Sequence, residues 1–285
     1  MTFSIAAADP STEEVGVATQ SKFLAVGAVV PWARAGVGAV GTQAFAEITF
    51  GPRGLDLLAE GLEPQAVLDR LLGADERRDE RQLGVVDARG RSASYTGPGC
   101  FEHAASVTGP NFACQGNILA SDRVVPAMAE AFDATAGQPL ADRMLSALRA
   151  AQREGGDRRG QEAAAILIHK PGGSYGGTFD RYIDLRVDHD DEPIEELSHL
   201  LALHQLYFDH SRQGELITAD PALEAEIAEI LKVRGKLTSG QDVWQALEDH
   251  LGWENLEERW AGRGRIDPCV LAYLRDQAAG RDPLP

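Results

Sequence analysis

The chain has few cysteines, and this shortage limits the kinds of protein it can be. Its 285 residues include three, at positions 100, 114 and 269, and their spacings are unrelated. An odd number does not suit a disulfide framework, and no CxxC or Cys/His zinc pattern occurs, which favours a reduced cytoplasmic setting. We therefore expect no bound metal and no cofactor.

Positive charge and long apolar runs are also scarce. Lys and Arg total 27 against 44 Asp and Glu, a formal net charge of −17. This excess of negative charge disfavours nucleic acids and anionic membranes, because phosphate binding needs clustered Lys and Arg. No run of about 18 apolar residues occurs, and the start lacks the pattern of a secretory signal. We expect a soluble cytoplasmic protein that binds neither nucleic acid nor membrane.

The first two thirds of the chain contain blocks of short strands separated by pairs of helices. The patterns predict strands over 2–8, 14–20, 25–30, 36–42, 82–87, 91–96, 111–115, 163–169 and 182–187, and helices over 52–62, 64–72, 122–134 and 140–153. Strands and helices do not alternate singly, so a mixed or antiparallel sheet with segregated helices is favoured over a Rossmann arrangement. We predict an α+β fold with two helices on each side of stacked sheets, which gives four layers.

The last third has no strand pattern. Helices are predicted over 194–208, 223–233, 243–250, 253–260 and 268–276. Between the first and second of these the apolar period lapses, and polar residues and Gly214 intervene. We predict one domain over residues 1–208 and a small all-α domain over 215–285.

Thr2, which follows Met1 at the start of the first predicted strand, carries a hydroxyl group. Met1 is readily removed when the second residue is as small as Thr2. The α-amine and the hydroxyl would then belong to one residue, and an amine that titrates near about pH 8 can take the hydroxyl proton. An ordinary N-terminal strand is the alternative interpretation of Thr2.

Seven blocks resemble the DUF1028 family in order, over about residues 1–208. They are Thr2–Ile5, Gly16–Ala18, Ala25–Pro31, Gly36–Ala44, Gly51–Leu55, Gln115–Asn117 and Gly155–Gly160. That family is grouped with the Ntn-hydrolases, so the resemblance implies an αββα four-layer sandwich. It also implies that Thr2 is a nucleophile that attacks an amide-like carbon. Self-cleavage before Thr42, Cys100 or Thr178, each preceded by Gly, is a further alternative in that superfamily.

The tail resembles the peptidoglycan-binding domain of the second type, over about residues 215–285. The matching blocks are Asp242–Leu247, Gly252–Arg259 and Arg265–Pro268. This resemblance implies a glycan ligand for the tail. Three tryptophans, at positions 244, 253 and 260, either form a sugar-stacking surface or fill the core of the module.

Two residues are expected to assist Thr2 in catalysis. Lys22 follows the second strand, and a Lys near the amine lowers the amine pKa and favours the neutral base. Ser4 lies on the same side of its strand as Thr2, because side chains alternate. A solvated surface Lys and a Ser that lines the core are the alternatives.

Substrate binding is assigned to uncharged donors and to a charged turn. Thr42, Gln43 and Asn117 are uncharged donors at strand ends and could stabilise an oxyanion. Asp157 and Arg158 lie on a Gly-flanked turn, where Arg could grip a carboxylate. The alternative for Asn117 is that it only forms a turn. The alternative for Asp157 and Arg158 is that they lie in a helix C-cap with their charges in solvent.

These assignments together predict a hydrolase that cleaves a small amide-like substrate and that could form a homo-oligomer. The alternative is a non-catalytic binding or scaffold protein on the same fold, associated with the cell wall through the tail.

The acidic run Asp188–Asp191, considered together with His169 and His189, suits a helix N-terminus better than a metal site.

Overall fold

The computed structural model describes residues 2–209, 211 and 213–281, and it divides into two units, residues 1–198 and 199–285. The division falls inside helix α5 (Pro193–Phe208), ten residues before the boundary that the sequence suggests. Within the described residues, no helix combines the length and apolar character needed to cross a bilayer.

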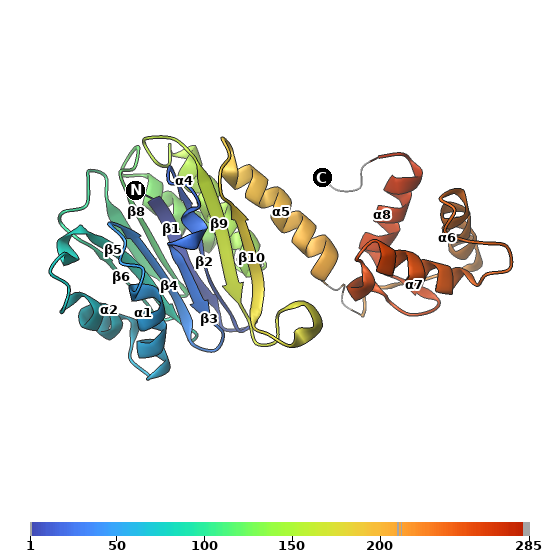
Figure 1. Ribbon diagram of the computed structural model, residues 1–285, viewed down its shortest axis with the longest axis horizontal. Coiled ribbons are helices and arrows are strands. Elements are labelled where there is room, and N and C mark those ends of the chain that lie inside the picture. Colours follow the sequence, from blue (N-terminus) through green and yellow to red (C-terminus); the bar gives the residue numbers. More distant parts are fainter. Residues whose placement is uncertain (1, 210, 212, 282–285) are drawn as a thin grey trace. The chain divides into compact units, whose positions relative to one another are not determined.

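The first unit combines helices with two antiparallel sheets, and the predicted α+β fold had allowed a mixed or an antiparallel sheet (Figure 1). The larger sheet has the order β10-β9-β2-β1-β8-β7 and the smaller one β3-β4-β5-β6. The strands are β1 (Thr2–Asp9), β2 (Glu14–Ser21), β3 (Pro31–Arg34), β4 (Gly38–Ala44), β5 (Arg81–Asp87), β6 (Ser92–Thr96), β7 (Ala105–Gly109), β8 (Phe112–Asn117), β9 (Ala163–His169) and β10 (Arg181–Val187).

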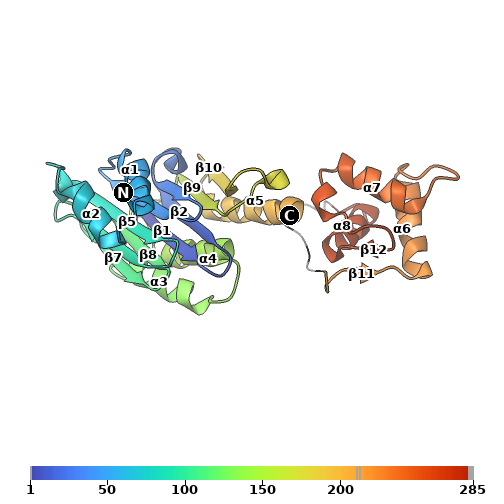
Figure 2. The same cartoon turned by 90° about the horizontal axis from the view of Figure 1, so that it is seen from below.

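Helices pack against both sheets (Figure 2). Helices α1 (Phe50–Ala59) and α2 (Pro64–Leu72) bury a leucine-rich face against β4, β5 and β6. Helices α3 (Val124–Ala134) and α4 (Leu140–Arg153) pack on β1, β2, β7 and β8. Because successive strand residues point to opposite faces, each central strand supplies one row of side chains to a helix layer and another to the space between the sheets.

The space between the sheets is apolar at one end and polar at the other. Its apolar end contains small residues such as Ala6, Ala8, Val17, Ala39 and Val86. Toward the start of β1 the same rows continue as hydroxyl and amide side chains. Small side chains let the two sheets approach closely, so a bulky group at this level has little room.

The strand predictions for the first unit are wrong at three places. Residues 25–30 do not form a strand: Ala25 has a φ of 53°, and Val26–Ala28 form a 3₁₀ turn. Val26 and Val30 are buried, but they belong to a loop that crosses from β2 to β3. Strands β3 and β7, which show no marked alternation of apolar residues, were not expected.

The second unit is mainly helical, with α6 (Pro221–Val233), α7 (Val243–Trp253) and α8 (Pro268–Ala278). It also contains a two-stranded sheet of β11 (Ile217–Thr218) and β12 (Arg265–Ile266), where no strand was expected, because two residues are too short to show a period. The helix predicted over residues 253–260 is not formed. Trp253 is the last residue of α7, and Glu257–Arg259 form a 3₁₀ turn.

A buried ion pair holds the second unit together beneath this turn. Arg259 Nη1 lies 3.1 Å from Asp267 Oδ2, and the two side chains are 5% and 2% exposed. Arg259 also donates to two carbonyls in the last turn of α5. Burial by itself raises the pKa of Asp267, but hydrogen bonds from Ser211 and Cys269 and the charge of Arg259 outweigh it and lower the pKa. The pair therefore stabilises the unit at neutral pH, and this contribution is lost as the pH falls through the lowered pKa.

We predict that Arg259→Leu destabilises the second unit by about 3–5 kcal/mol, because Asp267 would remain buried without its cation. Arg275→Leu is the matched control: Arg275 pairs with Glu226 at 2.7 Å, but its side chain is 52% exposed. That change should cost less than about 1 kcal/mol. Urea unfolding of the full chain, followed by tryptophan fluorescence, measures both, and equal costs would contradict the prediction.

Candidate functional site

Thr2 lies at the polar end of the space between the sheets. It is 4% exposed, and its hydroxyl donates to Ser21 Oγ at 3.0 Å. Its backbone carbonyl accepts from Gln43 Nε2 at 3.1 Å, and the strand register sets it opposite Asn117. The hydroxyl of Thr2 is thus held by Ser21 of the neighbouring strand, and its backbone carbonyl by an amide from the opposite sheet.

The Gln43 amide is fixed in orientation. Its Oε1 accepts from Ser4 Oγ at 2.6 Å, while its Nε2 donates both to Thr2 and to Gln82 Oε1, at 2.8 Å in the second case. Gln82 Oε1 also accepts from Asn117 Nδ2 at 2.7 Å. These side chains are all neutral, so the orientation of the amides does not depend on pH.

Gln115 extends the network toward the apolar end. Its Nε2 donates to Ser4 Oγ at 2.6 Å, whereas its Oε1 is buried and has no hydrogen-bond partner. Two glycines on the facing sheet make room for it: a Cβ on Gly84 would lie 2.1 Å from Gln115 Oε1, and one on Gly41 would lie 3.1 Å from its Nε2. The network therefore depends on glycine where the opposite strands pass the glutamine.

A cavity of about 390 Å³, here called the Thr2 cavity, opens beside Thr2 and Gln43. Its other lining residues are mostly apolar: Phe23, Val26, Val29, Val30, Ala44, Phe45, Ala46, Ile48 and Arg159. A second cavity of about 320 Å³, the Asn117 cavity, is lined by Ala44, Phe45, Glu80, Gly99, Cys100, Phe101 and Asn117. The two cavities share Ala44 and Phe45.

The wall between the cavities has a strained backbone. Ala44 has a φ of 66°, in the left-handed region that non-glycine residues seldom occupy. The next side chain, Phe45, is 53% exposed, and the Arg77 guanidinium stacks 3.7 Å from its ring centroid. Strain of this kind is concentrated at ligand sites, and the cation holds the exposed ring in place.

The charged turn presents Arg159, not Arg158, to the Thr2 cavity. Asp157 is buried and accepts from the backbone amides of Lys22, at 3.1 Å, and Arg159, at 2.9 Å. It also accepts from Arg159 Nε at 3.1 Å and Nη2 at 2.7 Å. Arg158 is half exposed and lies 3.9 Å from Glu102. The sequence could not distinguish two adjacent arginines on one turn.

Lys22 and Thr42 have contacts away from the Thr2 cavity. Lys22 Nζ donates to Gln161 O and pairs with Glu162 Oε2, each at 2.8 Å. That ion pair and the His189 contact lower the pKa of Glu162. Thr42 points to the helix side of β4, where its hydroxyl donates to Glu47 O at 3.2 Å. Neither residue lines the two cavities.

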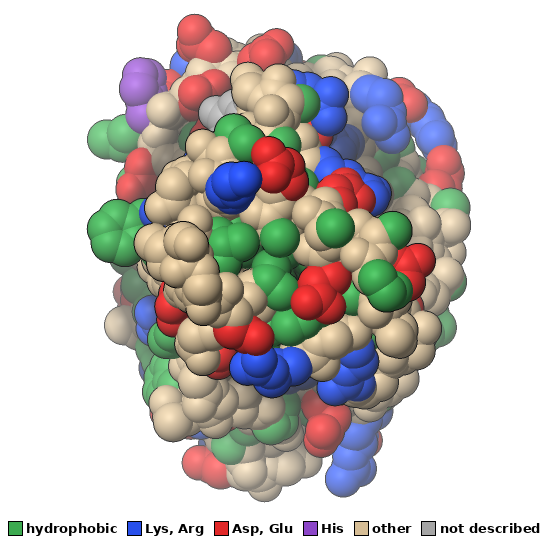
Figure 3. All heavy atoms as spheres, turned by 90° about the vertical axis from the view of Figure 1, so that its right-hand side faces the viewer, with side chains coloured by type: hydrophobic (Ala, Val, Ile, Leu, Met, Phe, Trp, Pro, Cys, Tyr) green, Lys and Arg blue, Asp and Glu red, His purple; other side chains and the backbone are tan. Residues whose placement is uncertain are grey.

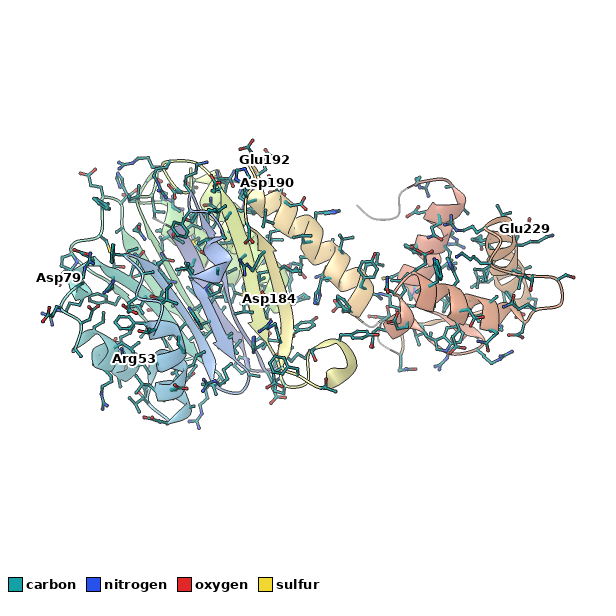
Figure 4. The ribbon with its side chains drawn as sticks, in the orientation of Figure 1. Arg53, Asp79, Asp184, Asp190, Glu192 and Glu229 are labelled. Atoms are coloured by element: carbon teal, nitrogen blue, oxygen red, sulfur yellow. The ribbon has the colours of Figure 1, made fainter. Side chains whose placement is uncertain are left out.

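Among the described residues, no group of three or more His, Cys, Asp or Glu side chains is gathered to hold a metal. Asp190 and Glu192 lie near each other at the start of α5 (Figure 4), where Asp190 Oδ1 accepts from the Glu192 amide at 2.7 Å. In the Asn117 cavity, burial raises the pKa of Cys100, which keeps its thiol protonated.

Ser21, Gln82, Gln115 and Arg159 are site residues that the sequence interpretation did not include. Alternation from Thr2, Ser4 and Asn117 was the available signal for Gln115, two residues before Asn117 on the same strand. Ser21 and Gln82 lie at ends of strands predicted to form hairpins, but the sequence does not show that these two ends meet at Thr2.

We predict that Gly84→Ala destabilises the protein by about 1–3 kcal/mol, because the new Cβ displaces Gln115. The cost should fall when Gln115→Ala is also present, since the obstructing amide is gone. Gly41→Ala, whose Cβ would lie no closer than 3.1 Å to a neighbouring atom, is the milder comparison. Denaturant unfolding of the single and double variants measures the coupling, and additive costs would contradict this account.

Comparisons with known proteins agree with this architecture. None of the curated proteins compared with the chain matches it. It is similar to the crystal structure of protein SPO2555 from Silicibacter pomeroyi, a DUF1028 protein, with 30% sequence identity and a TM-score of 0.64. The match covers 72% of this chain and 89% of that one. Residues 2–197 match the family described as a family of unknown function, DUF1028, so the chain belongs to the DUF1028 family.

Proposed function

We propose that the first domain is an Ntn-type amidohydrolase with an αββα four-layer architecture, acting on a small amide-like substrate. The two facing antiparallel sheets, with α1 and α2 on one and α3 and α4 on the other, support this architecture. The observation that carries the proposal is that Thr2, with a strand-end hydroxyl, lines the wall of a mainly apolar cavity.

The proposed reaction begins with removal of Met1, which lies outside the described residues. The freed amine of Thr2 takes the proton from its own hydroxyl, and Oγ1 attacks the acyl carbon of the substrate. The C–N bond breaks, the leaving amine receives that proton, and water then cleaves the acyl-enzyme to release the acid. No other base is required.

The proposal gives the neighbouring residues distinct tasks. Asn117, whose Nδ2 has a second N–H besides the one donated to Gln82, is the proposed donor to the substrate oxygen. Gln43 gives both N–H groups to Thr2 O and Gln82 Oε1, so its proposed task is to hold Thr2 in place, with its own orientation fixed by Ser4. Lys22 anchors the Asp157 turn through its backbone amide. We keep Thr42 in the proposal as a support for the end of β4 rather than as a cavity donor.

A non-catalytic binding protein on the same fold is the second proposal. Its support is that the hydroxyl of Thr2 donates to another hydroxyl, Ser21 Oγ, and not to a base. If Met1 stays attached, the amine is part of a peptide bond, and the cavity can bind a ligand without turning it over.

Thr2→Ala decides between the two proposals. Alanine is also small enough for Met1 removal, so processing stays matched. The hydrolase proposal predicts that wild type loses one methionine by intact mass spectrometry and hydrolyses a member of a panel of amides, lactams and γ-glutamyl compounds. Thr2→Ala should lower this rate by about 10³-fold or more with an unchanged unfolding curve. A wild-type mass that retains Met1, with no internal cut, would refute the mechanism.

For the helical tail we propose a glycan-binding role of the peptidoglycan-binding type. Trp244 is buried, and Trp260 packs against the core. Trp253, however, is 76% exposed, with Lys236 Nζ 4.8 Å from its ring. Figure 3 shows the helical unit end-on, with apolar, acidic and basic side chains interspersed on its surface. An exposed indole beside a cation suits stacking on a sugar face.

We predict that Trp253→Ala abolishes co-sedimentation of the full chain with purified peptidoglycan while changing the unfolding free energy by less than about 0.5 kcal/mol. Val233→Ala, another exposed apolar residue of this unit, is the control and should leave co-sedimentation unchanged. Failure of the wild type to sediment would refute the glycan role.

We also propose that the protein resides in the cytoplasm, that its substrate is a small molecule and that it forms a homo-oligomer.

A further inference from the structure

The Thr2 cavity combines an apolar wall with a single charge. Among the described residues that line it, Arg159 is the only charged one. At its rim, Phe23, Phe45 and Ile48 are each about half exposed. Exposed apolar side chains around a hollow mark binding sites in soluble proteins. The lining therefore suits a ligand with a small apolar body and one negatively charged group.

Arg159 is held in position before any ligand arrives. Its side chain is 34% exposed, whereas the side chain of its partner Asp157 is fully buried. Two backbone amides donate hydrogen bonds to Asp157 and fix its position. Its carboxylate also accepts hydrogen bonds from Nε and Nη2 of Arg159, which lie along one edge of the guanidinium. A guanidinium has five N–H donors in a planar fork, so pairing along one edge is compatible with a second contact along another.

The charge balance of this pair favours a monoanion. Asp157 and Arg159 sum to zero, and the Asp157 carboxylate lies 2.7 Å from Arg159 Nη2. The cost of desolvating an ion in a mainly apolar cavity rises with the square of its charge, whereas the attraction to Arg159, already offset by Asp157, rises only in proportion to the charge. A dianionic phosphate is therefore disfavoured relative to a carboxylate. Planar carboxylates also match the fork of Arg.

We infer that Arg159 is the specificity-determining residue of the site. The substrate of the site is then an amide that has a small apolar part and a free carboxylate. The carboxylate pairs with Arg159, and the amide carbon lies toward Thr2. This inference rests on the proposed function, in that it takes the Thr2 cavity as the substrate site. Arg158, the neighbour that the sequence favoured for this task, has no part in it.

Binding measured by calorimetry on the full chain tests the inference without requiring turnover. The probes are hexanoate, hexanamide and hexyl phosphate. Wild type should bind hexanoate at least about tenfold more tightly than either of the other two, as expected for a charge-assisted bidentate contact. Equal affinity for hexanoate and hexanamide, or tighter binding of hexyl phosphate, would overturn the inference.

Two substitutions on the turn locate the contact. Arg159→Leu should abolish the preference for hexanoate, and Arg158→Leu, which removes the same charge from the adjacent position, should preserve it. The reverse result would overturn the inference and assign the contact to Arg158. If Arg159→Leu does not fold, Arg159→Lys keeps the charge beside Asp157 but loses the fork. It should weaken hexanoate binding about tenfold and leave hexanamide binding unchanged, and unchanged hexanoate binding would refute the bidentate contact.

Kinetics separate this inference from the hydrolase proposal. Glutaric acid monoamide and its methyl ester differ only in the free carboxylate. Hydrolysis of both with equal kcat/KM would refute the role of Arg159 while leaving the hydrolase proposal intact. Hydrolysis of neither, together with Arg159-dependent hexanoate binding, would refute the hydrolase proposal and leave the carboxylate site standing.

Discussion

The structure of the first unit depends on the need to satisfy buried amides between two sheets that lie close together. Gln43 and Gln82 are nearly inaccessible to solvent, so each polar atom that lacks a protein partner costs free energy. Both belong to the smaller sheet, and their hydrogen bonds with Ser4, Thr2 and Asn117 of the larger sheet fix how the two sheets are aligned. Thr2 is held at this level because its backbone carbonyl is one of the acceptors in the same network.

The same requirement confines charge to the rim. A carboxylate or ammonium group within the network would have to be desolvated, whereas a neutral amide can be fully satisfied by two or three partners. Arg159, the charged residue that lines the Thr2 cavity, comes from the turn after α4, where it is paired with Asp157. The result is a neutral interior beside a cavity with one cation at its wall, a suitable setting for a small polar group to be held and oriented.

The helical unit solves a similar problem with charged groups. Arg259 and Asp267 are both buried, and each makes hydrogen bonds to the backbone in addition to their ion pair. Asp267 serves as the N-cap of α8 and anchors the 3₁₀ turn through Arg259, so one carboxylate joins two local structures. The aromatic residues are divided in the same way, with Trp244 in the core and Trp253 exposed.

Local sequence patterns determine much of this protein. The apolar period of α1 to α4, the alternation of β1 and β2, and the block order of strands and helices predict an α+β fold with a mixed or antiparallel sheet, and the structure confirms helices combined with antiparallel sheets. They also identify Thr2, Ser4, Gln43 and Asn117 as polar residues at strand ends. What the patterns describe correctly is local, because hydrogen-bonded helices and alternating strands are set by neighbours in sequence.

Only the tertiary structure decides which strand ends meet. Thr42 and Gln43 are adjacent and equally polar, yet one points to the helices and the other to Thr2. Only the packing of β4 between α1 and β1 shows which is which. Arg158 and Arg159 are separated in the same way by the buried Asp157. The sequence determined the elements and their polar residues. Contacts between sheets far apart in the chain decided the site, because the side of a strand or turn on which a side chain lies depends on what packs against it.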